Sequence, residues 1–525
     1  MDRGPDQRGA IAPLTFSGLP ATAAAQTETP VAPWSKTIEL RAPTVVRAYA
    51  VRIAQRLEAL GHRVSIVASP DARTPGTIDW LLWCEELAYR ARSTSFAPQP
   101  APATSATPAD IPCDLVIDLA GTASEGETPI LRLIFETGVG ETGLLSALLA
   151  SRSPALSIVI TQTGARPRTL RIARLAVERP LTLGSALDGV TPRLATLLGQ
   201  AIEDLDREAP PRLHAPDTPA TVSASAFGFA AAALAERISE KLTRLLRQPN
   251  CWRTAIRAHD GFGVMERFDW SGPAWSIIPD DGRRFYADPF LFAWEGRHWL
   301  FCEEYPYATG KGILVVAPVD ANGKAGAFRP ILEAEGHLSW PQVFLHEGQI
   351  YMIPESAAAH RIELWRATDF PYRWVLDRVL IDGVRAHDPV LHITPTGAFM
   401  LATVDDDGGS NWDALGLFHA PDLFGDWRAH PRNPLIVDAS SVRGASPIIR
   451  RGADLWRATQ DCRTGYGDGL VLCRVTRLDT SGFAQEVVAR LGAPPGLGAG
   501  GVHSLSRAGS FEAIDLRGAR SLPRA

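Results

Sequence analysis

A proline-headed motif recurs four times in the second half of the chain and constrains the fold more than any other feature. The copies open with Ala287-Asp288-Pro289, Ser339-Trp340-Pro341, His387-Asp388-Pro389 and Ala445-Ser446-Pro447. Their prolines are 52, 48 and 58 residues apart, and a degenerate fifth copy follows in which Val502 takes the place of proline. This spacing fits one four-stranded blade per repeat. The sequence therefore predicts a five-bladed β-propeller over 251–525, closed by a strand near 252–258 that completes the last blade.

The first half of the chain has a different pattern, in which strand-like and helix-like segments alternate over 37–206. That alternation predicts an α/β Rossmann-like domain. Strands are expected near 37–43, 63–68, 114–119, 130–135 and 156–161, and helices over 46–60, 78–92, 142–151 and 191–205. Two Pro-, Ala- and Thr-rich segments, 96–112 and 207–223, are expected to be loosely packed or disordered, the first as an insertion in this domain. Residues 1–36 are expected to be disordered, and 207–250 to form a linker and a docking helix.

Composition excludes some classes of partner. Lys and Arg number 53 against 58 Asp and Glu, a net charge of −5, and no long basic run could follow a phosphate backbone, so we expect no nucleic acid. We recognise no secretory leader and no apolar run of membrane-spanning length, so a cytoplasmic location is the expectation. The six scattered cysteines include no C-x-x-C pair and are expected to be reduced thiols.

An apolar stripe in the docking helix comprises Leu234, Ile238, Leu242 and Leu245. Such a stripe is typical of a helix that packs on its own protein. Peripheral membrane contact through 227–247 is the minor alternative.

The repeats resemble the five-bladed propellers of glycoside hydrolase family 43, whose inner strands begin with Asp-Pro-like dipeptides. A narrower resemblance, over roughly 251–520, is to the N-terminal domain of plant glucosamine inositolphosphorylceramide transferase and to bacterial proteins with that domain. The segments that resemble it are 285–292, 299–305, 336–341, 352–356 and 460–467. The resemblance implies a glycan or glycoconjugate as the partner of the propeller. In the plant enzyme the transferase chemistry is attributed to a separate C-terminal domain, so the resemblance does not bring that activity to this chain.

The N-terminal region resembles a degenerate formyltransferase domain through the segments 114–121 and 131–135. That family uses an Asn, a His and an Asp at its catalytic centre. No Asn precedes Asn250 in this chain. We therefore expect a scaffold or a relic here, and disfavour the hypothesis of a sugar-modifying transferase with the propeller as its recognition domain.

Glycosidic chemistry requires two carboxyl groups, one protonated to assist the leaving group and one ionised as base or nucleophile. Asp288 and Asp388 hold equivalent positions in repeats one and three, and the resemblance implies that they are the general base and a carboxylate that tunes the acid. Related hydrolases take the acid from a later blade, where this chain has Ser446. Glu355 is the substitute that we predict as the acid, because burial could raise its pKa.

Other polar and aromatic residues of the repeats are candidates for substrate binding: Glu304, Ser339, Trp340, Ser446, Asp461 and His503. Simpler interpretations stand beside these. Asp before Pro is a common strand-starting pair, Glu303 and Glu304 are more often solvated loop charges, and Trp residues in propellers mostly pack between blades. His503 is more often a hydrogen-bonded structural residue than a ligand for water or a cation.

The segment Gly138-Val139-Gly140-Glu141-Thr142-Gly143 has the glycine spacing of a phosphate-binding loop. The acidic residue expected about 20 positions later is absent, so an ordinary turn before a helix is favoured, and we expect no cofactor and no metal. Two functions remain open: an enzyme that hydrolyses or transfers a sugar, and a non-catalytic glycan-binding or scaffold module. The feature that distinguishes the two functions is the acidic Glu of a later blade, which related hydrolases have and which this chain replaces with Ser446.

Overall fold

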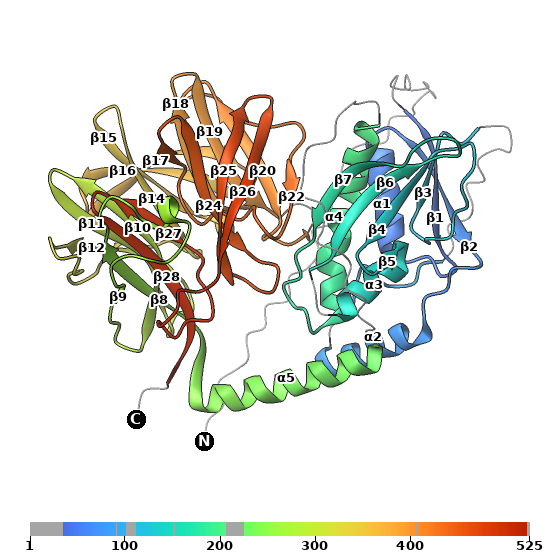
Figure 1. Ribbon diagram of the computed structural model, residues 1–525, viewed down its shortest axis with the longest axis horizontal. Coiled ribbons are helices and arrows are strands. Elements are labelled where there is room, and N and C mark those ends of the chain that lie inside the picture. Colours follow the sequence, from blue (N-terminus) through green and yellow to red (C-terminus); the bar gives the residue numbers. More distant parts are fainter. Residues whose placement is uncertain are drawn as a thin grey trace, which may run out of the picture. The chain divides into compact units, whose positions relative to one another are not determined.

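The computed structural model describes residues 35–90, 92–100, 112–150, 153–205, 225–405 and 408–521. Its second half forms five antiparallel sheets, which are the blades of a propeller (Figure 1). Blade one contains β10 (Arg284–Trp294), β11 (Arg297–Pro306), β12 (Ile313–Val319) and β13 (Arg329–Leu332). Blade two contains β14 (Ser339–His346), β15 (Gln349–Glu355), β16 (Arg361–Asp369) and β17 (Arg373–Asp382), with the short 3-10 helix η1 (Ala357–Ala359) between β15 and β16.

Blades three and four follow the same order. Blade three contains β18 (Ala386–Thr394), β19 (Gly397–Val404), β20 (Ala414–Ala420), β21 (Arg428–Ala429) and β22 (Ile436–Val437). Blade four contains β23 (Ile449–Arg451), β24 (Asp454–Asp461), β25 (Gly469–Asp479) and β26 (Gly482–Leu491).

The fifth blade combines the two ends of the propeller sequence. It contains β27 (Leu505–Ala508) and β28 (Phe511–Ser521), followed in the sheet by β8 (Arg247–Ala258) and β9 (Ser276–Ile277), with the short helix α6 (Val264–Arg267) between the last two. The β28–β8 pairing runs from Phe511 opposite Ala258 to Ser521 opposite Arg247. Five blades and ring closure by the strand near 252–258 are confirmed, although β8 begins four residues before the predicted boundary at Cys251.

The first half of the chain contains a mixed sheet in the order β2-β1-β3-β4-β6-β7, with β5 beside β4. The strands are β1 (Thr37–Pro43), β2 (Arg63–Ser69), β3 (Leu115–Asp118), β4 (Ile130–Phe135), β5 (Gly138–Val139), β6 (Ala155–Thr161) and β7 (Arg168–Arg174). Strands β1 to β4 pair in parallel, whereas β6 and β7 continue the sheet antiparallel. The five predicted strands are confirmed. Sequence analysis missed β7, in which every third residue is an arginine.

The helices of this half are α1 (Ala48–Ala59), α2 (Gly76–Tyr89), α3 (Gly140–Leu149) and α4 (Leu183–Glu203). The prediction for α4 was wrong at its start, because Pro192 lies inside the helix rather than near its beginning. The prediction that 96–112 is loosely packed was wrong at its first residues, since Phe96 is only 2% exposed and lies under the Arg47 guanidinium. Residues 101–111, the linker 207–223 and residues 1–34 lie outside the described part of the chain. All six cysteines are free in this structure.

The glycine-rich segment before α3 has a structural explanation. A Cβ on Gly140 would lie 2.5 Å from the carbonyl oxygen of Leu119, so the glycine allows α3 to start against the end of the sheet. Glu141, in the first turn of α3, is buried and accepts a hydrogen bond from the hydroxyl of Tyr49. A carboxylate thus lies at the helix end where a phosphate would have to bind, which supports the simpler interpretation.

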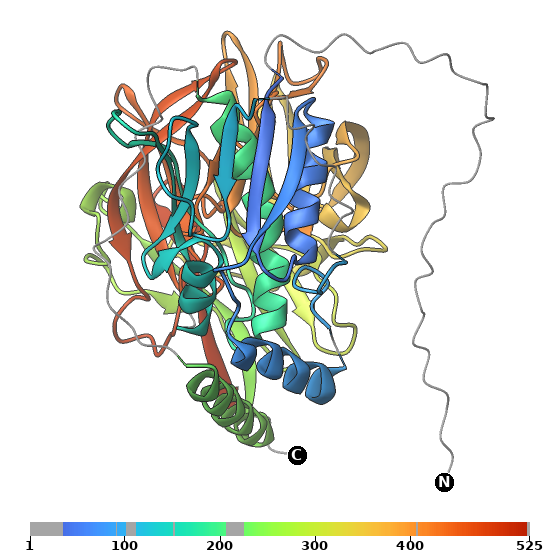
Figure 2. The same cartoon turned by 90° about the vertical axis from the view of Figure 1, so that its right-hand side faces the viewer.

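Helix α5 (Ala226–Leu246) runs beside α2, and the Trp80 and Phe227 rings lie 4.8 Å apart (Figure 2). Its packed face is Ala226, Phe229 and Ala233, whereas Leu234, Ile238 and Leu242 are 54–62% exposed. The prediction that the leucine stripe docks on the protein was therefore wrong for these three residues. The buried residues Ala226, Phe229 and Ala233 lie on another face of the helix from this stripe.

None of the helices described here has the length and hydropathy needed to cross a bilayer.

The inner strands of three blades share an unusual backbone. Asp288, Trp340 and Asp388 have φ of 47°, 48° and 46°, in the left-handed region, and the strand register slips at each of them. Non-glycine residues adopt this conformation at a cost of about 1–3 kcal/mol each. The slips turn the N–H groups of these residues toward the neighbouring blade, where they find acceptors that belong to the candidate site.

Candidate functional site

Asp288 and His503 meet at the axis of the propeller. The Nε2 of His503 lies 2.9 Å from Asp288 Oδ1, and its Nδ1 lies 2.8 Å from Asp515 Oδ2. All three side chains are at least 95% buried. Burial alone would lower the pKa of His503, but Asp515 and Asp288 outweigh it and raise the pKa to about 10. The ring is therefore an imidazolium between two carboxylates at neutral pH.

Asp388 belongs to a second group, from blades two to four. Its Oδ2 accepts hydrogen bonds from Arg443 Nε at 2.7 Å and from Gln460 Nε2 at 3.1 Å. Its backbone N–H donates to Glu355 Oε2 at 2.9 Å. Burial raises the pKa of Asp388 well above its ordinary value, although Arg443 opposes the rise.

Glu355 is in a different state from the one we predicted. Burial alone would raise its pKa, but His387, whose Nδ1 lies 3.2 Å from Oε1, lowers it, and Arg443 and the Asp388 N–H act in the same direction. The net effect holds the pKa of Glu355 well below its usual range. A carboxyl group that is held in its ionised form is a poor proton donor, so this state does not favour Glu355 as the acid.

Glu303 has the properties that we expected of Glu355. It follows Cys302 on β11, opposite Ala287, and is 7% exposed rather than a solvated loop charge. Burial, and then the negative charge of Asp288, raise its pKa well above the ordinary value. Its Oε1 lies 3.3 Å from Nε2 of His337, a residue whose side chain is 40% exposed. Glu303 therefore lies beside Asp288 and nearer the surface.

The other predicted residues are spread over different environments. Glu304 is buried, lies on the opposite face of β11 from Glu303 and pairs with Arg284. Ser339 is buried at the start of β14, and the Trp340 indole donates to Pro389 O between blades. Ser446 bonds within its own blade, accepting from Ala458 N and donating to Pro447 O. Asp461 is half-buried and paired with Arg463 and Arg490. Of these six candidates, only Trp340 and His503 contact Asp288.

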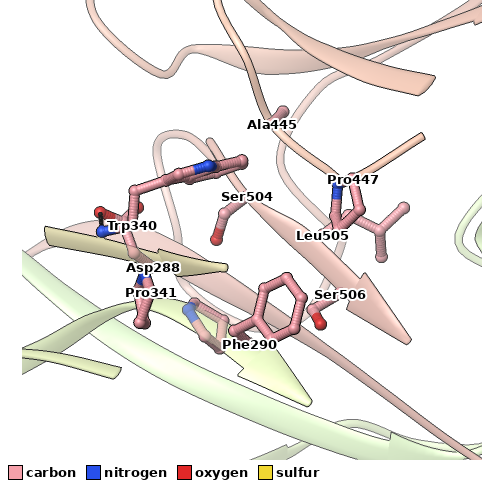
Figure 3. A pocket seen from close by; sticks show the side chains of 10 residues that line it. Asp288, Phe290, Trp340, Pro341, Ala445, Pro447, Ser504, Leu505 and Ser506 are labelled. Carbon is pink, nitrogen blue, oxygen red and sulfur yellow. Dashed lines mark hydrogen bonds between the residues drawn. The ribbon is translucent and has the colours of Figure 1, made fainter. Parts of the chain in front are cut away.

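A small cavity adjoins Asp288 on the axis (Figure 3). Its volume is about 10 Å³, enough for one water molecule and far too small for a sugar ring. Asp288, Trp340 and Ser504 line it together with apolar residues. The hydroxyl of Ser504 is buried, and its hydrogen bond helps to lower the pKa of Asp515. A water in the cavity would lie beside Ser504 and Asp288.

Aromatic side chains gather around the same end of the inner strands. Phe285 stacks on Tyr305 at 4.9 Å, Trp252 lies 3.9 Å from the His503 ring, and Trp412 lies 5.7 Å from Tyr466. The Arg443 guanidinium lies over the Tyr466 ring at 4.9 Å. Aromatic faces beside carboxylates are what sugar binding requires, since pyranose C–H faces pack on rings while hydroxyls bond to charged oxygens.

Among the described residues, the side chains of Asp288, His503 and Asp515 form a group that could hold a cation. Their ligating atoms lie within 4.8 Å of one another. Both His503 nitrogens already face carboxylate oxygens, and an imidazolium offers no lone pair to a metal. The protonated ring itself supplies the positive charge, so we assign no metal here.

We expect the free energy of unfolding to fall by about 1 kcal/mol or more per pH unit between pH 7 and 8.5. His503 has a folded pKa of about 10, so across this window the folded state keeps a proton that the unfolded state has lost. Glu303, with its raised pKa, acts in the same direction. Denaturant titrations at three pH values measure the slope, and NMR titration of the His503 ring checks the assignment. Stability that stays flat over this window would contradict the imidazolium.

Sequence reasoning missed Arg443, Asp515 and Gln460, and dismissed Glu303. None of them lies at the proline-headed positions on which the search concentrated. Glu303 and Gln460 do occupy matching places, the ends of second strands, as does Glu355. The shared position with Glu355, which was predicted, is the signal that points to Glu303 and Gln460.

The strands and the axial side chains define this protein as a five-bladed propeller with a buried carboxylate site. Residues 279–494 match the family described as glucosamine inositolphosphorylceramide transferase 1, N-terminal. Among curated proteins, the rice (Oryza sativa subsp. japonica) protein named glucosamine inositolphosphorylceramide transferase 1 is 31% identical over 212 residues, which are 40% of this chain and 28% of the relative. The Arabidopsis thaliana protein of that name is 28% identical over 211 residues, 39% of this chain and 27% of the relative. The chain thus spans little more than a quarter of the relatives' length.

Among solved structures, the catalytic domain of the Coprinopsis cinerea GH62 α-L-arabinofuranosidase has a TM-score of 0.34 and 14% identity. The match covers 50% of this chain and 86% of that one. The blade count given above rests on the strand pairing of this chain itself.

Proposed function

We propose that the propeller binds a glycan or glycoconjugate at the mouth of its axis and acts on a glycosidic bond, by hydrolysis or sugar transfer. The observation that supports this most directly is the surplus of carboxyl groups over cations. Among the described residues, the group contains five buried carboxyl groups, on Asp288, Glu303, Glu355, Asp388 and Asp515, and at most three cations, on Arg443, His387 and His503. Since unpaired buried charges cost several kcal/mol, some of these groups must keep their protons.

Glycosidic chemistry uses one protonated and one ionised carboxyl group, and this group offers a candidate for each. Glu303 has a raised pKa and contacts the partly exposed His337, so it is our candidate for the general acid. Asp288 borders the water-sized cavity and is our candidate for the general base. Asp388 is fixed by Arg443 and Gln460, which suits a carboxylate that orients and tunes the acid rather than one that transfers a proton.

Glu303→Gln tests the acid. On substrates with poor leaving groups, we expect turnover to fall about 10²-fold or more, since the leaving oxygen is no longer protonated. On aryl glycosides such as 4-methylumbelliferyl β-D-glucosaminide, the loss should be much smaller, because a good leaving group departs without a proton. The alkaline limb of the pH–rate profile should also disappear. Glu363→Gln, in the third strand of blade two, is the matched control, and an equal loss on both substrate types would reject Glu303 as the acid.

The first probes follow from the names of the relatives, which specify glucosamine and inositolphosphorylceramide. Glucosaminides, glycosyl inositol phosphates and a broad glycan array should be screened for both binding and turnover. Binding with no turnover of any probe would favour the second function below, and the absence of binding to any glycan would sink both.

The alternative is a non-catalytic glycan-binding module, and one observation favours it. The axial carboxylates already have structural tasks, because they accept the N–H groups of the left-handed residues in the next blade: Asp515 from Asp288, Asp288 from Trp340 and Glu355 from Asp388. The equivalent position in blade four is Ser446, which bonds only within its blade among the contacts described. Loss of turnover in Glu303→Gln separates this alternative from the enzyme.

A further inference from the structure

The segment 408–413, between β19 and β20, has two faces. Ser410 and Asp413 bond to residues of the α/β domain. Asn411 and Trp412, which lie between them, face Arg443 and the aromatic residues of the axis. The segment therefore joins the α/β domain to the candidate site.

Arg193 of α4 is the centre of the first face. It is completely buried, its Nε donates to Asp413 Oδ1 at 3.0 Å, and its Nη2 donates to the carbonyl oxygens of Val404 and Ser410 at 2.8 and 2.6 Å. The backbone approaches the guanidinium so closely that a Cβ on Gly409 would lie 2.7 Å from Arg193 Cζ. One side chain of the α/β domain thus binds the segment at both ends.

Two further bonds hold the same residues. The backbone N–H of Ala176 donates to Asp413 Oδ2 at 2.8 Å, and the Ser410 hydroxyl donates to Glu178 Oε1 at 2.7 Å. The Ser410 hydroxyl also accepts the N–H of Trp412 at 3.1 Å. The conformation of Trp412 is therefore tied to contacts with the other domain.

The second face of the segment is connected to Asp388 through a single side chain, that of Arg443. Arg443 Nη1 donates to Asn411 twice, to the backbone oxygen at 3.0 Å and to Oδ1 at 2.7 Å. The Nε of the same guanidinium donates to Asp388 Oδ2 at 2.7 Å. Asn411 thereby fixes the orientation in which Arg443 meets Asp388.

We propose that the α/β domain positions the axial site of the propeller, with Arg193 as the positioning residue. By holding 408–413, Arg193 keeps Asn411 against Arg443, and Trp412 beside Tyr466. The positioning itself is independent of the ligand, whereas its consequence for glycan binding rests on the function proposed above. Positioning the axial site would give the α/β domain a role that needs no catalytic residue in that domain.

The test is the double variant Arg193→Met/Asp413→Asn in the full chain. Removing both charges together avoids leaving Asp413 as a buried carboxylate without its guanidinium, and the Asn oxygen can still accept the N–H of Ala176. Gln200→Ala is the matched control, because Gln200 donates to Pro434 O across the same interface and its hydrogen bonds among the described residues do not include 408–413. Circular dichroism and size-exclusion chromatography establish that each variant is folded.

Hydrogen exchange is the readout that needs no ligand. We expect peptides covering 408–415 and 440–446 to exchange about tenfold faster in the double variant and at the wild-type rate in Gln200→Ala. If the double variant is folded and both peptides keep wild-type exchange, the positioning role is wrong. Should the double variant not fold, Arg193→Lys is measured in its place, since it keeps the charge but cannot make the forked contacts.

Glycan affinity is the second readout, with the strongest ligand from the array as the probe. Affinity should fall about tenfold or more in the double variant and by less than about twofold in Gln200→Ala. Faster exchange with unchanged affinity would overturn the coupling to the site. If the wild type binds no glycan, the proposed function fails, and the exchange data alone decide whether Arg193 positions Arg443.

Discussion

Asp288→Asn is expected to lower turnover on a glycan substrate by about 10²-fold or more. The amide keeps the shape of the side chain and can still accept the N–H of Trp340, as the carboxylate does at 3.2 Å. It removes the charge that a base beside the water-sized cavity would need. It also removes one of the two carboxylates that raise the pKa of His503, so that pKa should fall toward its ordinary value.

The matched control for this change is Asp377→Asn, on the outer strand of blade two, where Asp377 pairs with half-exposed arginines. Its turnover should stay within about twofold of the wild type, since surface ion pairs contribute little. If the protein only binds, Asp288→Asn should weaken glycan affinity by about 1–3 kcal/mol at most. A variant that unfolds while the control does not would make Asp288 a structural residue of the ring and remove it from the site.

Arg443→Met is expected to cost about 3–5 kcal/mol of unfolding free energy. The guanidinium is buried, donates to Asp388 Oδ2 at 2.7 Å and lies 3.9 Å from Glu355 Oε2. Its removal takes away the cation that lowers the pKa of both carboxyl groups, so they bind a proton more readily than in the wild type. Denaturant titration measures the loss, which should be smaller at low pH because that proton becomes easier to add.

The comparison for this second change is Arg474→Met on blade four. The Arg474–Glu486 pair is close to half exposed on both sides, so its loss should cost far less unfolding free energy than the loss of Arg443. Equal losses in the two variants, or a loss at Arg443 that does not depend on pH, would show that the guanidinium acts through packing rather than charge.

Much of the propeller could be predicted from the sequence, because the spacing of one motif gives the length of each blade and the motif itself marks the start of each inner strand. The proline fixes the entry to the inner strand, and the residue before it takes the left-handed conformation at Asp288, Trp340 and Asp388. Blade four departs from this pattern, with Ser446 outside the left-handed set, yet its strands were still found from the spacing.

The site was harder to predict, because its charges are set by contacts between blades. Glu303 and Glu304 are adjacent in sequence, but strand alternation sends only Glu303 toward Asp288 and His503. Glu355 was chosen for the burial that would raise its pKa, and it is buried. What the sequence could not show is that His387 and Arg443 come from later blades to hold it ionised.

The bonds that run from one blade to the next at the axis have a consequence for how this protein could change over time. Asp515, Asp288 and Glu355 each hold the neighbouring inner strand in place as well as forming the candidate site. A lineage that lost its reaction would still lose stability on replacing these acids, so they would be retained by the needs of folding alone. The presence of all three in a relative is therefore no sign of activity. Glu303, whose side chain has no such bond between blades among the contacts described, is the residue whose loss would record the change from enzyme to binding protein.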